Sequence, residues 1–320
     1  MFIRPRMRLA PDNTTFRFMN GRIAGLVVSA ILSTASVVLF FYPGLNLGID
    51  FSGGIVMEVR TDGPADFQKI RGALADEHVL DQGVQRFGDD STVLIRLPTQ
   101  PTEAGTQVAV SKVRSALESS VRGAKIVRVD AVGASVSAEL FRNGLYALGI
   151  SLLMILAYIW FRFEWQFAVG AVVTLILDVT KAIGFLALTR IEFDLVMVAA
   201  ILTILGYSTN DKVVVYDRVR ENLRKYKVMP LRDLIDLSIN ETLNRTLGTS
   251  MTVFLASLPL ALFGGASISG FAWVMLFGIV VGTSSSIFIA APILLFLGEK
   301  RLRRDTVVAE APGTGAAPRP

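Results

Sequence analysis

Six long runs of apolar residues limit what this chain can fold into more than any other feature of its sequence. A run of about 20 apolar residues can cross the ~30 Å hydrocarbon core of a bilayer as a helix. The sequence therefore predicts a polytopic α-helical membrane protein with six transmembrane helices. The runs lie at about 23–42, 141–161, 165–189, 195–216, 247–264 and 271–297.

Basic residues lie beside these runs and indicate which helix ends are cytoplasmic. Residues 217–246 carry seven lysines and arginines, whereas the two predicted short loops on the opposite side carry only Arg190 between them. The first run ends without a small-x-small cleavage site, which favours a permanent span over a cleaved signal peptide. We therefore predict a cytoplasmic N-terminus at 1–22, a cytoplasmic loop at 217–246 and a disordered cytoplasmic tail at 299–320.

The stretch 43–138 differs from the rest of the chain because short β-like runs alternate in it with amphipathic helical runs. The expected order is strand, helix, strand, strand, helix, strand, which is the split-βαβ, ferredoxin-like order. Counting spans from a cytoplasmic N-terminus places this α+β domain on the far side of the membrane. Residues 139–298 are then a five-helix bundle. The predicted strands are 55–60, 84–87, 92–97 and 125–132, and the predicted helices are 65–77 and 106–121.

The composition argues against several classes of protein. There is no cysteine and only one histidine, so thiolate or histidine metal sites and a Ser-His-Asp triad have few candidate groups. The sequence also has no GxxxxGK[ST], HExxH or GxGxxG motif. The net charge of +5 is concentrated beside the apolar runs, which indicates membrane topology rather than nucleic-acid binding. We expect no enzyme activity, cofactor or metal, and any work done must draw on an ion gradient or a partner.

A few polar residues lie inside the predicted spans, where each ionisable group costs roughly 2.5–3.5 kcal/mol by insertion scales. Asp178 and Lys181 are three residues apart and so share a helix face. Two interpretations remain open: an ion or proton relay, or a static salt-bridge cluster that holds the third and fourth spans together. The residues concerned are Asp178, Lys181, Asn210, Asp211 and Lys212, with Asp217 at the cytoplasmic end of the fourth span.

Three segments closely resemble the SecF family, whose members are the smaller membrane subunits of bacterial SecDF export complexes. They are GLNLGIDFSGG (44–54), GYSTNDKVVVYDRVREN (206–222) and SINETLNRTLGTSMT (238–252), with a looser match at VGASVSAEL (132–140). The resemblance implies a member of the resistance-nodulation-division superfamily in the bacterial inner membrane. It also implies pairing with SecD, work with the SecYEG channel on a translocating polypeptide at the expense of the proton-motive force, and YajC and YidC as further candidate partners.

The resemblance also implies roles for individual residues. The family's relay carboxylates map onto Asp178 and Asp211, and Asn210 and Arg245 occupy matching motif positions. Other matching motif positions are Asp50, Gly53, Gly54, Gly206, Asp217 and Arg218.

The sequence departs from the common family pattern at the predicted relay. Leu177 stands where many members have histidine, Lys212 where many have serine or threonine, and Lys181 where a neutral residue is usual. Either the lysines take part in the relay or they lock it. The alternatives to an energy-coupled export subunit are therefore a non-conducting scaffold of the translocon and one half of a small-molecule proton antiporter.

Overall fold

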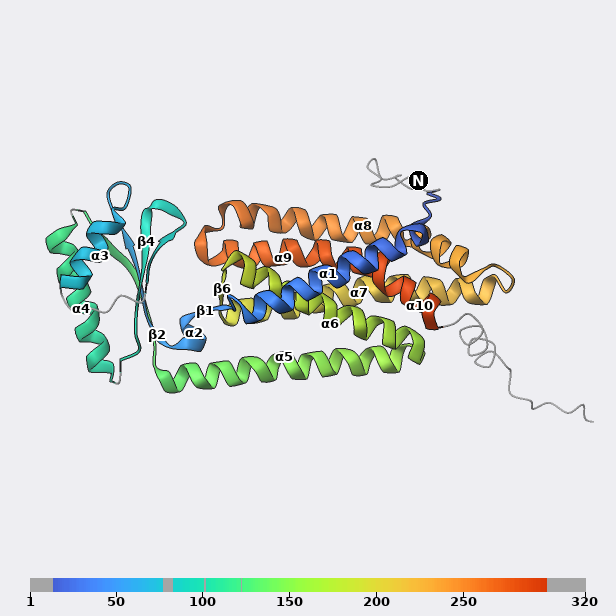
Figure 1. Ribbon diagram of the computed structural model, residues 1–320, viewed down its shortest axis with the longest axis horizontal. Coiled ribbons are helices and arrows are strands. Elements are labelled where there is room, and N and C mark those ends of the chain that lie inside the picture. The colour runs from blue at the N-terminus through green and yellow to red at the C-terminus, as the bar shows by residue number, and fades with distance from the viewer. Residues whose placement is uncertain (1–13, 77–82, 101, 122, 298–320) are drawn as a thin grey trace, which may run out of the picture.

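The computed structural model describes residues 14–76, 83–100, 102–121 and 123–297. The chain forms an α+β unit at one end and a bundle of long helices at the other, as Figure 1 shows. The predicted disordered tail and most of the predicted N-terminal segment lie outside the described residues.

Six helices in the described part of the chain are long and apolar enough to cross a membrane, which confirms the predicted number of spans. A short 3-10 turn, η1 (Phe18–Gly21), precedes the first of them. The last consists of three consecutive pieces, with a π-helical turn in the middle. The helices are α1 (Arg22–Phe41), α5 (Ala134–Arg162), α6 (Trp165–Thr189), α7 (Leu195–Lys225), α8 (Leu231–Phe263) and α9 (Gly265–Ser285), which continues through η2 (Ser286–Ala290) into α10 (Ala291–Leu297).

Three of the six spans are central and three are peripheral. About half of the most apolar window is buried in α6 (50%), α7 (56%) and the last span (56%), against 17%, 11% and 17% in α1, α5 and α8. Close contacts at glycine bring the helices together: a Cβ at Gly184 of α6 would collide with Ser36 of α1, and one at Gly278 of α9 would collide with Ile204 of α7. The peripheral helices therefore leave wide apolar faces uncovered.

The predicted cytoplasmic loop at 217–246 is mostly helical. Helix α7 continues to Lys225 and α8 begins at Leu231, so only 226–230 connect them. Apolar side chains such as Val219 and Leu234 continue the bundle core along this extension. The basic residues that suggested a loop lie on two long helices that extend beyond the apolar stretches.

The α+β unit, called here the sheet domain (54–132), has its elements in the predicted order. One antiparallel sheet has the strand order β3-β4-β2-β5. Both helices lie on the sheet face that points away from the bundle (Figure 1) and bury an apolar core against it. The elements are β2 (Gly54–Arg60), α3 (Phe67–Asp76), β3 (Gly83–Phe87), β4 (Asp89–Leu97), α4 (Glu103–Ser120) and β5 (Lys125–Val132).

A short segment connects α1 to the sheet domain and touches the start of α7. It contains β1 (Asn46–Leu47) and the single helical turn α2 (Ile49–Ser52). Strand β1 pairs in parallel with β6 (Glu192–Phe193), which immediately precedes α7.

Candidate functional site

A buried ionic cluster lies where α6, α7 and the last span meet, and its centre is the carboxylate of Asp178. Asp178 Oδ2 accepts hydrogen bonds from Lys212 Nζ at 2.8 Å, from the Ser208 hydroxyl at 2.7 Å and from the Ser285 hydroxyl at 2.8 Å. Lys212 also donates to both serine hydroxyls. All four side chains are buried. A single carboxylate oxygen therefore joins three elements of the bundle.

Lys181 lies near the other oxygen of the same carboxylate. Its Nζ lies 4.0 Å from Asp178 Oδ1, which is within ion-pair distance. Asp178 Oδ1 is buried and has no hydrogen-bond partner among the described residues. Two lysines thus face one aspartate, and the second of them is held more loosely than the first. We call Asp178, Lys181, Ser208, Lys212 and Ser285 the Asp178 cluster.

Asp211 is buried and precedes Lys212 in the sequence, but its side chain points away from the Asp178 cluster. Adjacent helical residues diverge by about 100°, so Asp211 faces the hydroxyls of Ser286 and Thr246 instead of Asp178. Its Oδ2 atom has no hydrogen-bond partner in the described part of the chain. The two carboxylates and two lysines therefore do not form two equal pairs.

The structure places three of the predicted residues away from the cluster. Asn210 and Gly206 are exposed on α7, and Arg245 is exposed on α8. Polar side chains on an open face of a membrane bundle are costly unless protein or a water-filled cavity covers them.

Asp217 and Arg218 lie in ion pairs at the basic end of the bundle. Asp217 accepts a 2.6 Å contact from Arg162 of α5. Arg218 contacts Glu241 of α8 at 2.7 Å and Glu221, one turn along α7, at 2.6 Å. These pairs connect α5, α7 and α8 at this end of the bundle.

The remaining predicted residues, Asp50, Gly53 and Gly54, lie at the junction of bundle and sheet domain. Gly53 and Gly54 have φ values of +69° and +120°, and a Cβ at Gly54 would lie 2.7 Å from the Leu97 carbonyl oxygen. Only glycine enters β2 this way without strain. Asp50 Oδ2 accepts a 3.2 Å hydrogen bond from the backbone N–H of Leu195, the first residue of α7.

Two members of the cluster, Ser208 and Ser285, were missed by sequence reasoning. Serine is common in membrane helices, so its presence alone does not predict a role. The available signals were the run of three serines at 284–286 in an apolar span and the position of Ser208 one turn before Lys212. The π-helical turn begins at Ser286, beside this run, and such turns often mark functional sites.

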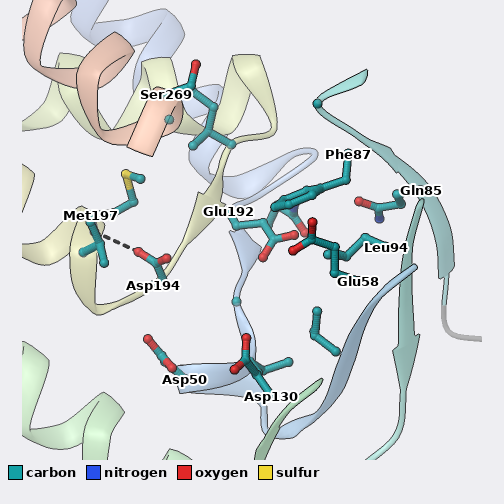
Figure 2. A pocket seen from close by; sticks show the side chains of 18 of the residues that line it. Asp50, Glu58, Gln85, Phe87, Leu94, Asp130, Glu192, Asp194, Met197 and Ser269 are labelled. Carbon is teal, nitrogen blue, oxygen red and sulfur yellow. Dashed lines mark hydrogen bonds between the residues drawn. The ribbon is translucent and has the colours of Figure 1, made fainter. Parts of the chain in front are cut away.

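A cleft of about 890 Å³ separates the uncovered sheet face from the adjacent end of the bundle. Figure 2 shows Glu58 and Asp130 of the sheet domain together with Asp50, Glu192 and Asp194 around it. Burial, helped by the neighbouring carboxylates of Asp50 and Glu192, raises the pKa of Asp194. In the described ranges, no three His, Cys, Asp or Glu side chains converge in a way that could hold a metal ion.

Comparison with known families gives matches to two separate segments of the chain. Residues 112–300 match the family described as protein export membrane protein SecD/SecF, C-terminal, and residues 38–65 match the SecD/SecF GG motif. The first match contains the Asp178 cluster, and the second contains Asp50, Gly53 and Gly54.

Individual relatives agree with these matches along nearly the whole chain. The protein translocase subunit SecF of Rickettsia felis is 41% identical over 302 residues, which cover 94% of this chain and 98% of the relative. The SecF of Rhodobacter capsulatus is 41% identical over 309 residues, covering 92% and 93%.

Solved structures of SecDF give the same comparison in three dimensions. The crystal structure of SecDF from Thermus thermophilus, described as a translocon-associated membrane protein, superposes with a TM-score of 0.83 at 31% identity. A second SecDF structure, in a super-membrane-facing form, gives a TM-score of 0.65 at 30% identity. The alignments cover 92% and 97% of this chain but only 40% and 42% of the SecDF chains.

Proposed function

Because the chain belongs to the SecF family of protein translocase subunits, we propose that it acts with SecD to use the proton-motive force for polypeptide translocation through SecYEG. On this proposal it is not an enzyme in its own right, binds no nucleic acid and needs no cofactor. YajC and YidC remain further candidate partners. The observation that carries the proposal is the Asp178 carboxylate, buried between two lysines at the meeting point of three membrane helices.

Pairing with SecD is supported by the surfaces that the bundle leaves open. The faces of α1, α5 and α8 are largely uncovered, and the polar side chains of Asn210 on α7 and Arg245 on α8 are exposed. The SecDF chains to which this chain is similar contain more than twice the aligned length, so additional protein is available there to cover such faces. We propose that the SecD spans cover Asn210 and Arg245 and that lipid contacts the rest.

The proposed topology has cytoplasmic termini and residues 43–138 in the periplasm as a ferredoxin-like domain. The strand order β3-β4-β2-β5 supports that domain type. The basic ends of α7 and α8 lie at the end of the bundle farthest from the sheet domain, and the positive-inside rule places such ends in the cytoplasm.

The proposed relay works by changing the charge of Asp178. A proton that binds Asp178 from the periplasmic side removes the negative charge that holds Lys212, so α6, α7 and the last span can shift relative to one another. Release of that proton toward the cytoplasm restores the 2.8 Å contact. Such coupling requires that protonation favour one global arrangement over the other. Asp178 Oδ1, which has Lys181 Nζ at 4.0 Å, and Asp211 Oδ2 accept no hydrogen bond from the described residues. This supports a relay, because buried polar atoms in a static cluster are normally hydrogen-bonded.

A scaffold that conducts no ions is the second candidate. It is favoured by the complete occupation of Asp178 Oδ2, which receives three hydrogen bonds from two helices besides its own. In a scaffold these contacts would clamp the bundle permanently. The lysines would then lock the site and take no part in a cycle.

Depletion of this chain in its host, followed by rescue, tests the proposal. We expect unprocessed precursors of periplasmic proteins to accumulate and wild type to clear them. Asp178→Asn should fail, whereas Asp233→Asn, a matched change at an exposed position in the first turn of α8, should rescue. Full rescue by Asp178→Asn would favour the scaffold over the relay. If no precursors accumulate at all, the export role is contradicted, and the small-molecule antiporter becomes the better hypothesis.

Replacement of Lys212 separates the two roles of the lysine. Lys212→Thr should impair export if the ammonium group must be released and recaptured by Asp178. Export at the wild-type rate would mean that Lys212 only holds the helices together.

A further inference from the structure

The segment 44–53, called here the joint segment, leaves α1 and lies against the start of α7 before entering the sheet domain. In the parallel pairing of β1 with β6, Asn46 is opposite Glu192 and Leu47 is opposite Phe193. The next backbone N–H, of Gly48, donates to the Phe193 carbonyl at 2.9 Å. A Cβ at Gly48 would lie 3.1 Å from Asp194 Cβ, so the backbone contact has little room for a side chain.

Asp50 extends this contact to the helix itself. The first N–H groups of a helix have no partner within the helix and carry its positive dipole end. In α7, Asp194 caps the Met197 N–H at 2.9 Å, and Asp50 accepts from the Leu195 N–H at 3.2 Å. One cap thus comes from the chain that continues into α7 and the other from the joint segment. Figure 2 shows the bond between Asp194 and Met197 as a dashed line and Asp50 below it.

The joint segment is also fixed to the sheet domain and to α5. It continues directly into β2 at Gly54. From the neighbouring strand β4, Arg96 forms an ion pair with Glu192 and donates to the Leu47 carbonyl at 3.3 Å. The Phe51 ring packs at 5.4 Å from the Phe193 ring and at 5.6 Å from the Phe141 ring of α5.

We propose that the joint segment fixes the sheet domain to α7 as one moving unit and that Asp50 is a positioning residue acting through α7 on Lys212. Helix α7 is continuous from Leu195, whose N–H donates to Asp50, to Lys212, and these residues are about 26 Å apart along the helix at ~1.5 Å per residue. A displacement at Lys212 therefore reaches the joint without an intervening break. This inference rests on the proposed function, because it says how the Asp178 cluster is connected to the domain outside the bundle.

A reversible covalent bond across β1 and β6 tests the proposal. The chain has no cysteine, so Asn46→Cys with Glu192→Cys introduces one defined pair at directly opposed positions. Neighbouring strands lie about 4.8 Å apart, within the Cα separation that a disulfide tolerates. The readout is the rate of precursor processing in cells that carry the full chain with its natural partners, under oxidising and then reducing conditions.

Three results are expected. The oxidised double-cysteine protein should process precursors at the rate of its reduced form, because a contact that stays closed is not harmed by a bond. Asp50→Ala should slow processing about fivefold, the factor that corresponds to the loss of about one helix cap. Adding the oxidised cysteine pair to Asp50→Ala should restore the rate, and reduction should remove the restoration.

Each single cysteine should behave alike under both conditions, and Asp50→Asn should remain near wild type because the amide oxygen can still accept the bond. Loss of export on oxidation of the double-cysteine protein would overturn the proposal, since the joint would then have to open. Normal export with Asp50→Ala, or no rescue by the bond, would remove Asp50 from this role. A failure of the relay itself would be seen separately, as normal export with Asp178→Asn.

Discussion

The buried centres of the sheet domain and of the helix bundle are lined by similar aliphatic side chains but enclose different groups. The sheet domain buries Ile55, Ile95 and Leu74 in one apolar cluster, and the polar side chains buried in its described part, Thr61 and Thr92, carry no charge. The bundle surrounds Asp178 and Lys212 with residues of the same kind. The first centre can do little besides stabilise its fold. The second keeps charged groups buried away from water. In such a site a change of protonation strongly changes the electrostatic energy.

The comparison predicts the largest effect for removing the charge at the centre of the bundle. Asp178→Leu leaves Lys212 and Lys181 buried without a counterion, and breaking a buried pair costs about 3–5 kcal/mol. The change should lower the midpoint of thermal unfolding in detergent and abolish export. Combining it with Lys181→Met and Lys212→Met should recover much of the stability but none of the export.

This triple variant is the decisive control. Recovery of stability without function would show that the ionic cluster is retained for its chemistry. If Asp178→Leu alone is as stable as wild type, the ion pairs of Asp178 with the two lysines do not stabilise the bundle. The two buried centres would then not differ in what stabilises them.

The next largest effect is expected in the sheet domain. Leu74→Ala removes a fully buried side chain from an apolar core, which costs about 2–5 kcal/mol. Hydrogen exchange should rise in the sheet amides while the amides of α6 and α7 stay protected. Val108→Ala, at an exposed position of α4, should change stability by less than about 0.5 kcal/mol. Equal loss of protection in both regions would show that they unfold as one unit.

The two regions also differ in how far the sequence predicts them. The length of the apolar runs was sufficient to predict the number of spans, and short periodic patterns were sufficient to predict the order of elements in the sheet domain, because both depend on local sequence. Charge inside an apolar run was sufficient to select Asp178 and Lys212. Which lysine pairs with which aspartate depends on the rotation of α6 against α7, which no local spacing specifies.

Other features were hidden for related reasons. The segment 217–246 has the charge of a loop, but its apolar face packs against the bundle and keeps it helical. Strands β1 and β6 have two residues each and pair across about 145 positions, so neither has a detectable period. Asn210 and Arg245 match family motifs yet lie away from the cluster, and a single chain cannot show what covers them.

A smaller effect is expected for the hydroxyl groups around Asp178. Ser285→Ala removes a 2.8 Å hydrogen bond to the buried carboxylate. Hydrogen bonds to charged groups contribute about 1.5–3 kcal/mol, so the unfolding midpoint should fall measurably. Ser284→Ala is the matched control, because among the described residues its hydroxyl donates only to the Val281 carbonyl of its own helix. Equal effects of the two changes would mean that Ser285 has only a local role.

The smallest effect is expected where the two regions meet, at Asp194. Burial, with the carboxylates of Asp50 and Glu192 nearby, raises its pKa in the folded protein above the ordinary value of 3.8. The folded state therefore holds the proton more tightly, and the stability that this contributes is complete below the unfolded pKa and lost as pH rises through the folded pKa. Asp194→Asn cannot titrate but can still cap α7.

The unfolding midpoints of Asp194→Asn and wild type should thus converge in acid and separate as pH rises, with the variant the more stable by less than about 1 kcal/mol at neutral pH. The comparison requires the same detergent and salt at each pH, so that the other carboxylates titrate equally in both proteins. A gap that does not change with pH would mean that Asp194 keeps its charge when folded. Asp194 would then behave like a carboxylate at an ordinary solvated surface, although Asp50 and Glu192 lie beside it.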